Sequence, residues 1–220
     1  MITLTIITIN EKVISRYPSA VFGSLIVKNV VNKKEDLKLN EKKKNFQNDL
    51  KNTYKNPNDD KILQFYIKYF KKWNKTYPIE YQLKSIHKGK DLPNVSVLVD
   101  SMFYAELQNR ILISGHDLDK IIGTMEFDLA TGDEQYIKID GNIQQLKEGD
   151  ILLHDDKDIL ANILYGPAKR STINLKTKNA LYLAWCPEGI DEKVVKKHLH
   201  DLLSNLVLIY GHLDATINIL

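Results

Sequence analysis

Residues 101–120 read S-M-F-Y-A-E-L-Q-N-R-I-L-I-S-G-H-D-L-D-K, which combines a helix, a strand and a polar run. The helix is predicted to end near Arg110 and to place Glu106 and Asn109 on one face, because residues three apart are neighbours on a helix. A short apolar strand follows at residues 111–113. The polar run after it contains Ser114, Gly115, His116, Asp117 and Asp119. A strand flanked by polar groups in this way predicts a pocket.

Glu106 is the acidic residue of this segment with the most apolar neighbours, since it stands between Ala105 and Leu107. It is predicted to be either a partly buried carboxylate with a displaced pKa or a structural acid whose hydrogen bonds are satisfied. The first alternative makes Glu106 a functional candidate, and the second gives it a role in the fold alone.

Two helices are predicted before and through this segment. The first has Asn58 or Asp59 as its N-cap and carries a continuous stripe at helical spacing. The stripe consists of Ile62, Phe65, Tyr66, Tyr69, Phe70 and Trp73. Lysines interleave with these rings and could support base stacking, but packing in the core is the favoured interpretation. Pro93 is predicted in the first turn of the second helix, which continues with apolar side chains to Leu107.

The rest of the chain is predicted to be rich in strands. Alternating Thr and Ile predict a strand at residues 1–10, and residues 20–31 form a second apolar run. Turn residues then separate runs at 124–129, 136–139, 151–154, 159–165, 172–175 and 180–186. A final helix begins near Asp191 and aligns Val195, Leu199, Leu202, Leu206 and Ile209. These elements predict an α+β fold with antiparallel or mixed sheets, in a single domain over residues 1–220.

Basic residues are concentrated in one part of the chain. The 220 residues carry a formal net charge of +3, whereas residues 28–90 contain 17 Lys and 7 acidic residues. We predict a Lys-rich helical insertion at about residues 32–75, interrupted near Asn56 and Pro57 because the residue before proline avoids helical geometry. The lysines could form an RNA-facing surface that neutralises phosphates, or a solvated helix face.

Missing signals exclude several classes of protein. The single cysteine, Cys186, cannot form an internal disulfide, and the first ten residues lack signal-peptide features. No apolar run is long enough for a membrane helix, and the glycine-rich nucleotide loops, the H-E-x-x-H helix and the G-x-S-x-G elbow are absent. His198 and His200 are close in sequence, but their spacing places them on different sides of a helix. We expect a cytoplasmic protein with no membrane partner, no cofactor, no ATP site and no metal.

The quoted segment also resembles a known family. The β-subunit of bacterial phenylalanyl-tRNA synthetase carries N-V-V-D-x-T-N-Y-V-x-L-E-x-G-Q-P-L-H-A-F-D-L-D-K. This chain reads N-V-S-V-L-V-D at 94–100, M-F-Y-A-E-L at 102–107 and L-I-S-G-H-D-L-D-K at 112–120. T-Y-P-I-E-Y-Q-L at 76–83, K-G-K at 88–90 and Y-G-P at 165–167 are similar to the solo B3/B4-domain proteins, which resemble the synthetase editing domain without its catalytic body. The resemblance covers about residues 17–208.

The resemblance implies a β-sandwich-like mixed sheet core flanked by helices, and a trans-acting hydrolase of mischarged aminoacyl-tRNA. The aminoacyl ester is already activated, so an oriented water and a stabilised oxyanion can suffice. The implied catalytic residues are Ser114, His116 and Thr172. The implied substrate-binding residues are Glu106, Asn109, Gly115, Asp117, Tyr165, Gly166 and Arg170. Within the basic segment at 28–90, the expected RNA-binding residues are Lys71, Lys72, Lys88 and Lys90.

The chain departs from the synthetase pattern at two positions. The synthetase histidine of L-H-A-F-D aligns nearest to Ser114, and the tyrosine-reading glutamate falls in the apolar run near Leu183. A tyrosine hydroxyl would lose its acceptor there, so tyrosine specificity is not expected to carry over. Two other functions stay open: a non-catalytic tRNA- or RNA-binding module, and a pocket protein for amino-acid derivatives. The sequence does not define the amino acid, the tRNA or the oligomeric state.

Overall fold

Two β-sheets pack face to face in the computed structural model of the chain, which describes residues 6–53 and 59–220. The five-stranded sheet has the order β1 (Ile7–Ile9), β4 (Met125–Leu129), β7 (Ile151–His154), β8 (Ile159–Asn162) and β9 (Gly166–Pro167). The four-stranded sheet has the order β11 (Asp214–Ile219), β2 (Val21–Lys28), β10 (Ala180–Cys186) and β3 (Ile113–Asp117). Only the β1–β4 pair of these two sheets is parallel. The predicted α+β class with a sandwich-like mixed core is confirmed.

Aromatic side chains fill the space between the two sheets. Phe22 of β2 stacks on Phe127 of β4 with 4.1 Å between ring centroids, and Trp185 of β10 meets Phe127 edge-on at 4.9 Å. All seven residues of β10 are buried, because this strand is paired on both edges and covered on both faces. A continuous apolar run, and not an alternating one, is the pattern such a strand requires.

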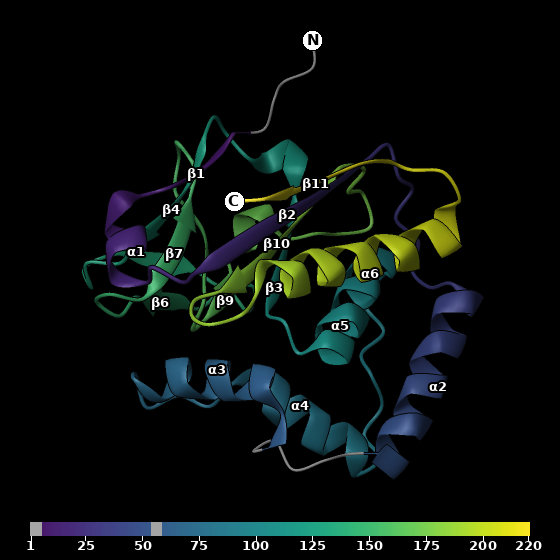
Figure 1. Cartoon of the computed structure of the whole chain (residues 1–220). Helices are drawn as coiled ribbons and strands as arrows, with labels where there is room; N and C mark the ends of the chain where they lie inside the picture. The colour runs from purple at the N-terminus through teal and green to yellow at the C-terminus, as the bar shows by residue number, and fades with distance from the viewer. Residues whose placement is uncertain (1–5, 54–58) are drawn as a thin grey trace.

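Helices cover the other face of the four-stranded sheet (Figure 1). The chain forms α1 (Glu11–Arg16), α2 (Leu37–Thr53), α3 (Lys61–Lys71), α4 (Pro78–His87), α5 (Val97–Asn109) and α6 (Glu192–Tyr210). α5 and α6 pack on each other, and α6 lies against β2. Asp191 caps α6 as predicted, since its side chain accepts the Lys193 N–H. No helix in the described ranges is long and apolar enough to span a membrane.

The aromatic stripe of α3 belongs to the core, as predicted. Tyr66, Tyr69 and Phe70 are buried, and the Tyr66 ring stacks on Tyr77 at 4.4 Å. The N-cap is Asp60, whose side chain accepts the N–H groups of Ile62 and Leu63, so the predicted Asp59 cap was wrong by one residue. The alternative cap, Asn58, lies outside the described residues.

The predicted start of α5 at Pro93 is also wrong. α5 begins at Val97, because the first-turn N–H groups find acceptors in the segment after β2: Lys33 O accepts from Val97 and Asn32 Oδ1 accepts from Leu98. The Asp100 carboxylate accepts the Val95 N–H and pairs with the buried Lys43 of α2 at 2.7 Å. These contacts hold the Pro93 segment outside the helix.

Other predicted boundaries shift or fail. The strand predicted at 111–113 is β3 at Ile113–Asp117, because Arg110 ends α5 with a positive φ of 60° and pairing with β10 begins at Ile113. Residues 172–175 form no strand; Thr172 makes an isolated bridge to His116. The β5 (Gln135–Ile137) and β6 (Ile143–Gln145) hairpin agrees with prediction only in its first strand.

Several elements were not predicted from the sequence: α1, α4, β6, β9 and β11. Of the strand predicted at residues 1–10, the structure shows β1, and residues 1–5 lie outside the described ranges. The predicted break at Asn56 and Pro57 also lies outside the described ranges. α2 and α3 occupy the predicted Lys-rich segment.

Gly23 of β2 is required by the close approach of α6. An added Cβ would lie 2.8 Å from Leu199 Cδ1 and 3.1 Å from Val195 Cγ1. We expect Gly23→Ala to lower the free energy of unfolding by about 1–3 kcal/mol through overpacking, measured by urea denaturation. Leu199→Ala alone should be destabilising, but less so in the Gly23→Ala background because the clash is relieved. Simple additivity of the two changes would contradict this packing.

Candidate functional site

A pocket of about 410 Å³ opens along the outer edge of β3, between α5 and the β8–β9 connection. Its wall is formed mainly by apolar side chains of α5, β3 and the segment from Asn162 to Ile173. The polar residues among its lining are Gln82, Glu106, Ser114, Asn162 and Thr172, and the lining also includes Gly115 and Gly166. A largely apolar pocket with a few converging polar groups is the usual form of a small-molecule site.

The backbone of β3 presents donors to this pocket because β3 is the last strand of its sheet. Leu112 O accepts from Trp185 N on the β10 side, whereas the Ile113 N–H points away from β10 and donates to Glu106 Oε1 at 3.2 Å. Peptide groups alternate in direction along an antiparallel strand, so the Gly115 N–H lies on the same open edge as that of Ile113. This edge provides an oriented donor beside the cavity.

Gly115 also gives the pocket its space. A Cβ at this position would lie 2.9 Å from both Met102 Sδ and Ile173 Cδ1, which line the same cavity. Any larger residue would therefore push these side chains into the pocket.

Glu106 supplies the carboxyl group of the pocket. Its side chain is buried, and burial raises its pKa to about 8, opposed only by the hydrogen bond from the Ile113 N–H. The interpretation of Glu106 as a buried carboxylate with a displaced pKa is therefore the better one. Near it in the lining, Gln82 Oε1 is buried and has no hydrogen-bond partner in the described ranges. Both groups are polar atoms that a ligand could satisfy.

Ser114 and His116 belong to a buried hydrogen-bond chain. Ser114 Oγ lies 2.9 Å from His116 Nε2 and accepts the Trp185 indole N–H at 2.9 Å, while His116 Nδ1 lies 2.9 Å from Ser171 Oγ. The indole can only donate, so Ser114 Oγ accepts from it; an arrangement that pairs every atom has Ser114 donating to Nε2 and Nδ1–H donating to Ser171. Burial, with a smaller effect of Arg170, lowers the pKa of His116 to about 3. His116 is therefore a neutral and weakly basic imidazole.

The structure brings together only some of the predicted site residues. Five of them line the pocket: Glu106, Ser114, Gly115, Gly166 and Thr172. His116 is not part of the lining and contacts Ser114, which is. Asn109 instead binds His198 and Asp201 of α6, and Asp117 accepts the Thr177 hydroxyl at 2.9 Å. Arg170 pairs with Asp155, and Tyr165 contacts Lys75 at 5.0 Å from the ring centroid. Thr172 donates to backbone oxygens of Ala168 and Lys169.

The predicted RNA-binding lysines occupy two different places. Lys71 and Lys72 lie at the end of α3, where Lys72 contacts Glu188 at 3.5 Å and approaches the Tyr17 ring. Lys88 and Lys90 follow α4, and both are exposed. Lys90 lines a groove beside the main pocket.

This groove has a volume of about 430 Å³ and was not predicted from the sequence. It shares Gln82, Val95 and Phe103 with the main pocket, so the two cavities adjoin. Tyr81 in its wall is 65% exposed. The tyrosine and Gln82 lie on α4, and the helical period of residues 78–87 was the signal that could have found them.

Comparison with known proteins places the chain among synthetase-related domains. The family model of the B3/4 domain matches residues 61–206. The phenylalanine–tRNA ligase β-subunit of Mycoplasma genitalium is 31% identical over 67 residues, covering 30% of this chain and 8% of that protein. The Mycoplasma pneumoniae β-subunit is 27% identical over 99 residues, covering 45% of this chain and 12% of that protein. The chain thus matches about a tenth of the length of these relatives.

A solved structure shares the fold. It is an N-terminal fragment of the phenylalanyl-tRNA synthetase β-subunit from Pyrococcus horikoshii, with a TM-score of 0.54 and 12% identity, covering 98% of this chain and 50% of that one.

Glu106 should make stability depend on pH. Its carboxyl is ionised above about 4.5 in the unfolded chain but stays protonated up to about 8 in the fold. The folded state thus holds an extra proton between these values, and its stability falls as the pH rises from 4.5 to 8. We expect Glu106→Gln to lose less stability than the wild type between pH 5 and pH 8 in urea denaturation.

The exposed Glu148 provides a matched control, and Glu148→Gln should keep the wild-type dependence. Burial raises the pKa of Asp150 to about 6, so Asp150 also lowers the stability of the fold as the pH rises. Its contribution is the same in the wild type and in both variants. An unchanged pH dependence in Glu106→Gln would contradict the assignment.

Proposed function

Since the chain belongs to the B3/4 domain family and is a tRNA-synthetase-related module, we propose that it hydrolyses mischarged aminoacyl-tRNA in trans. The observation that carries this proposal is a buried carboxyl with a pKa near 8 beside an oriented backbone donor in an apolar pocket. An ester bound between these two groups meets a proton acceptor on one side and an oxyanion donor on the other.

The pocket suits the amino-acid side chain of such a substrate. Val99, Met102, Phe103 and Ile173 offer apolar contact, and Gly115 keeps the floor free of a side chain. Burying apolar groups there favours binding by about 25 cal/mol per Å². Glu106 and Gln82 provide the polar contacts.

We assign proton transfer to Glu106. A general base works best when its pKa lies near the operating pH, and a pKa of about 8 meets that condition better than the value of about 3 for His116. In the step we propose, water attacks the ester carbonyl carbon and gives its proton to the Glu106 carboxylate. The Gly115 N–H stabilises the oxyanion that forms. When the oxyanion collapses, the bond between the carbonyl carbon and the ribose oxygen breaks, and the protonated Glu106 returns its proton to the ribose oxygen and becomes a carboxylate again. Ser114 helps to place the water.

The adjoining groove suits the terminal nucleotide of the tRNA. Tyr81 can stack on a base because its ring is exposed, and Lys90 can pair with a phosphate. The groove shares residues with the main pocket, so a nucleotide in it would deliver its ester-linked amino acid to Glu106. This arrangement favours a tRNA-linked substrate over a free amino-acid derivative.

The Lys-rich segment contributes less to this surface than its composition suggests. Lys43 is buried against Asp100, Lys42 donates to Asn205 Oδ1, and Lys38 donates to Leu208 O. These lysines of α2 anchor the helix to α5 and α6. We propose that α2, which precedes the matched residues 61–206, is an addition to the B3/4 core within a single domain.

A non-catalytic tRNA-binding module is the second candidate. The burial of His116 and the two hydrogen bonds of Ser114 Oγ favour it, because neither group is free to act as a nucleophile or base in the manner of a Ser–His pair. The proposals separate in one experiment, since only the hydrolase releases amino acid.

A panel of aminoacyl-tRNAs tests the proposal directly. We expect ester hydrolysis above the buffer rate for at least one amino acid, with kcat/KM rising with pH and levelling above about pH 8, where Glu106 is ionised. Glu106→Gln should lower kcat about 100-fold, within the usual contribution of a general base, and remove that pH dependence. Release from no member of the panel, with tRNA still bound, would support the binding module instead.

Tyr81→Ala tests the nucleotide groove. Loss of one base stack costs about 1–3 kcal/mol, so we expect kcat/KM for aminoacyl-tRNA to fall roughly tenfold while hydrolysis of a small amino-acid ester is unchanged. Lys90→Ala should also lower kcat/KM for aminoacyl-tRNA and leave hydrolysis of the small ester unchanged. Its effect should be larger at low salt, where the contact between lysine and phosphate is less screened. The exposed Lys147, outside both cavities, gives the control Lys147→Ala. Equal losses on tRNA and small ester would contradict the groove assignment.

A further inference from the structure

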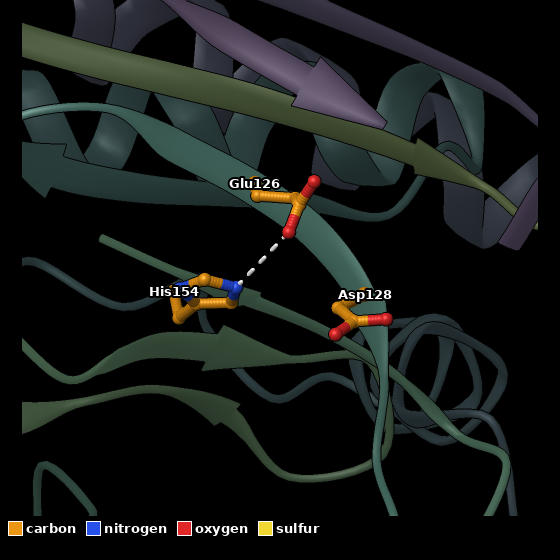
Figure 2. Close-up of side chains that lie close together, drawn as sticks. All are labelled: Glu126, Asp128 and His154. Atoms are coloured by element: carbon orange, nitrogen blue, oxygen red, sulfur yellow. Dashed lines mark ion pairs between the residues drawn. The ribbon is translucent and has the colours of Figure 1, made fainter. Parts of the chain in front are cut away.

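Three potential metal ligands converge on the five-stranded sheet, away from the pocket. Glu126 and Asp128 are two residues apart on β4 and so share one face of the sheet, and His154 of β7 is the direct cross-strand partner of Glu126. Their ligand atoms all lie within 4.8 Å of one another, and all three side chains are partly exposed. Figure 2 shows the three side chains gathered on the same side of the two strands.

The separations are close to those around a bound ion. His154 Nε2 and Glu126 Oε2 are 3.6 Å apart. Two tetrahedral ligands, each about 2.0 Å from zinc, are separated by about 3.3 Å. Small side-chain rotations would therefore bring one nitrogen and two carboxylate oxygens onto a common ion, leaving a further coordination position for water.

Contacts from outside the group orient two of the ligands. His154 Nδ1 lies 3.2 Å from the backbone oxygen of Asp155 and donates to it, so Nε2, which faces Glu126, is the ring nitrogen that can bind an ion. A backbone carbonyl that fixes the tautomer in this way is the usual support of a metal-binding histidine. Asn10 Nδ2 approaches Glu126 Oε2 at 3.4 Å and holds this carboxylate in place.

The site is open to an ion from solvent. Asp128 and His154 also line a shallow cleft of about 380 Å³, together with Glu134, Asp155, Asp156 and Asp158. Lys157 is the basic residue among the lining of this cleft. The excess of carboxylates attracts cations toward the three ligands.

We propose that Glu126, Asp128 and His154 bind a divalent transition-metal ion that links β4 to β7. An imidazole combined with two carboxylates favours such an ion over Mg²⁺ or Ca²⁺, which take oxygen ligands. This set could not be predicted from local spacing, because His154 lies 26 positions after Asp128 and strand pairing is what brings the two residues together. The ion stabilises the five-stranded sheet independently of the activity proposed for the pocket.

Calorimetric titration of the full, tag-free chain with Zn²⁺ tests the proposal. We expect one saturable site per chain, and a rise in the thermal midpoint with added Zn²⁺ because the ion binds the folded state. His154→Gln and Glu126→Gln should each weaken Zn²⁺ binding at least tenfold and remove the rise in midpoint. Asp128→Asn provides a third variant, and circular dichroism before the titration identifies any variant that fails to fold.

The exposed His200 of α6 gives a matched control, and His200→Gln should bind Zn²⁺ like the wild type. The absence of a saturable one-to-one site would overturn the proposal. So would wild-type affinity in folded His154→Gln, or an equal loss of affinity in His200→Gln.

Discussion

The pairing of β3 with β10 is the interaction on which the site depends. β3 has four polar or small residues among its five, whereas β10 is apolar and buried throughout. The two strands pair from Ile113 opposite Ala184 to Asp117 opposite Ala180. β10 is held on its other edge by β2, so its position is fixed by the core. Within the part of the chain that the structure describes, no strand of the sheet pairs with the outer edge of β3, where His116 makes only an isolated bridge to Thr172. The Ile113 N–H on this edge donates to Glu106, and that of Gly115 points to the same edge.

The pairing of β3 with β10 buries polar side chains. The hydrogen bonds that each of these side chains makes distinguish those with a role in the fold from the functional candidate. Asp117 is held by Thr177, and His116 by Ser114 and Ser171, so these groups offset their loss of solvation by hydrogen bonds inside the protein. Glu106 receives one backbone hydrogen bond and has a strongly raised pKa. An incompletely compensated carboxyl beside a cavity is the arrangement expected where binding or catalysis has been favoured over stability.

The sequence predicted those features that depend on local spacing. The core stripe of α3 and the cap and apolar face of α6 follow from a period of 3.6 residues, and β10 follows from a continuous apolar run. β3 was placed too early because its residues are polar, and polarity in a strand is explained only by distant partners such as Ser171 and Thr177. Likewise, Glu106 and Asn109 share a helix, but the packing of α6 draws Asn109 away from the pocket. Distant contacts of this kind are not encoded in local spacing.

The carboxyl of the pocket comes from a different element than the synthetase pattern suggested. Leu183, the position nearest to the tyrosine-reading glutamate, lies opposite Ser114 inside the sheet and is absent from the lining of the pocket. Glu106 approaches the same cavity from α5, which is tied to β10 by the Tyr182 hydroxyl donating to Leu98 O. The Glu106 carboxyl therefore lies beside the edge of β3 and not across the face of the sheet. In the proposed site, a ligand without hydrogen-bonding groups would leave Gln82 Oε1 unpaired and would add nothing to the one hydrogen bond that Glu106 accepts from the Ile113 N–H, so such a ligand would be disfavoured.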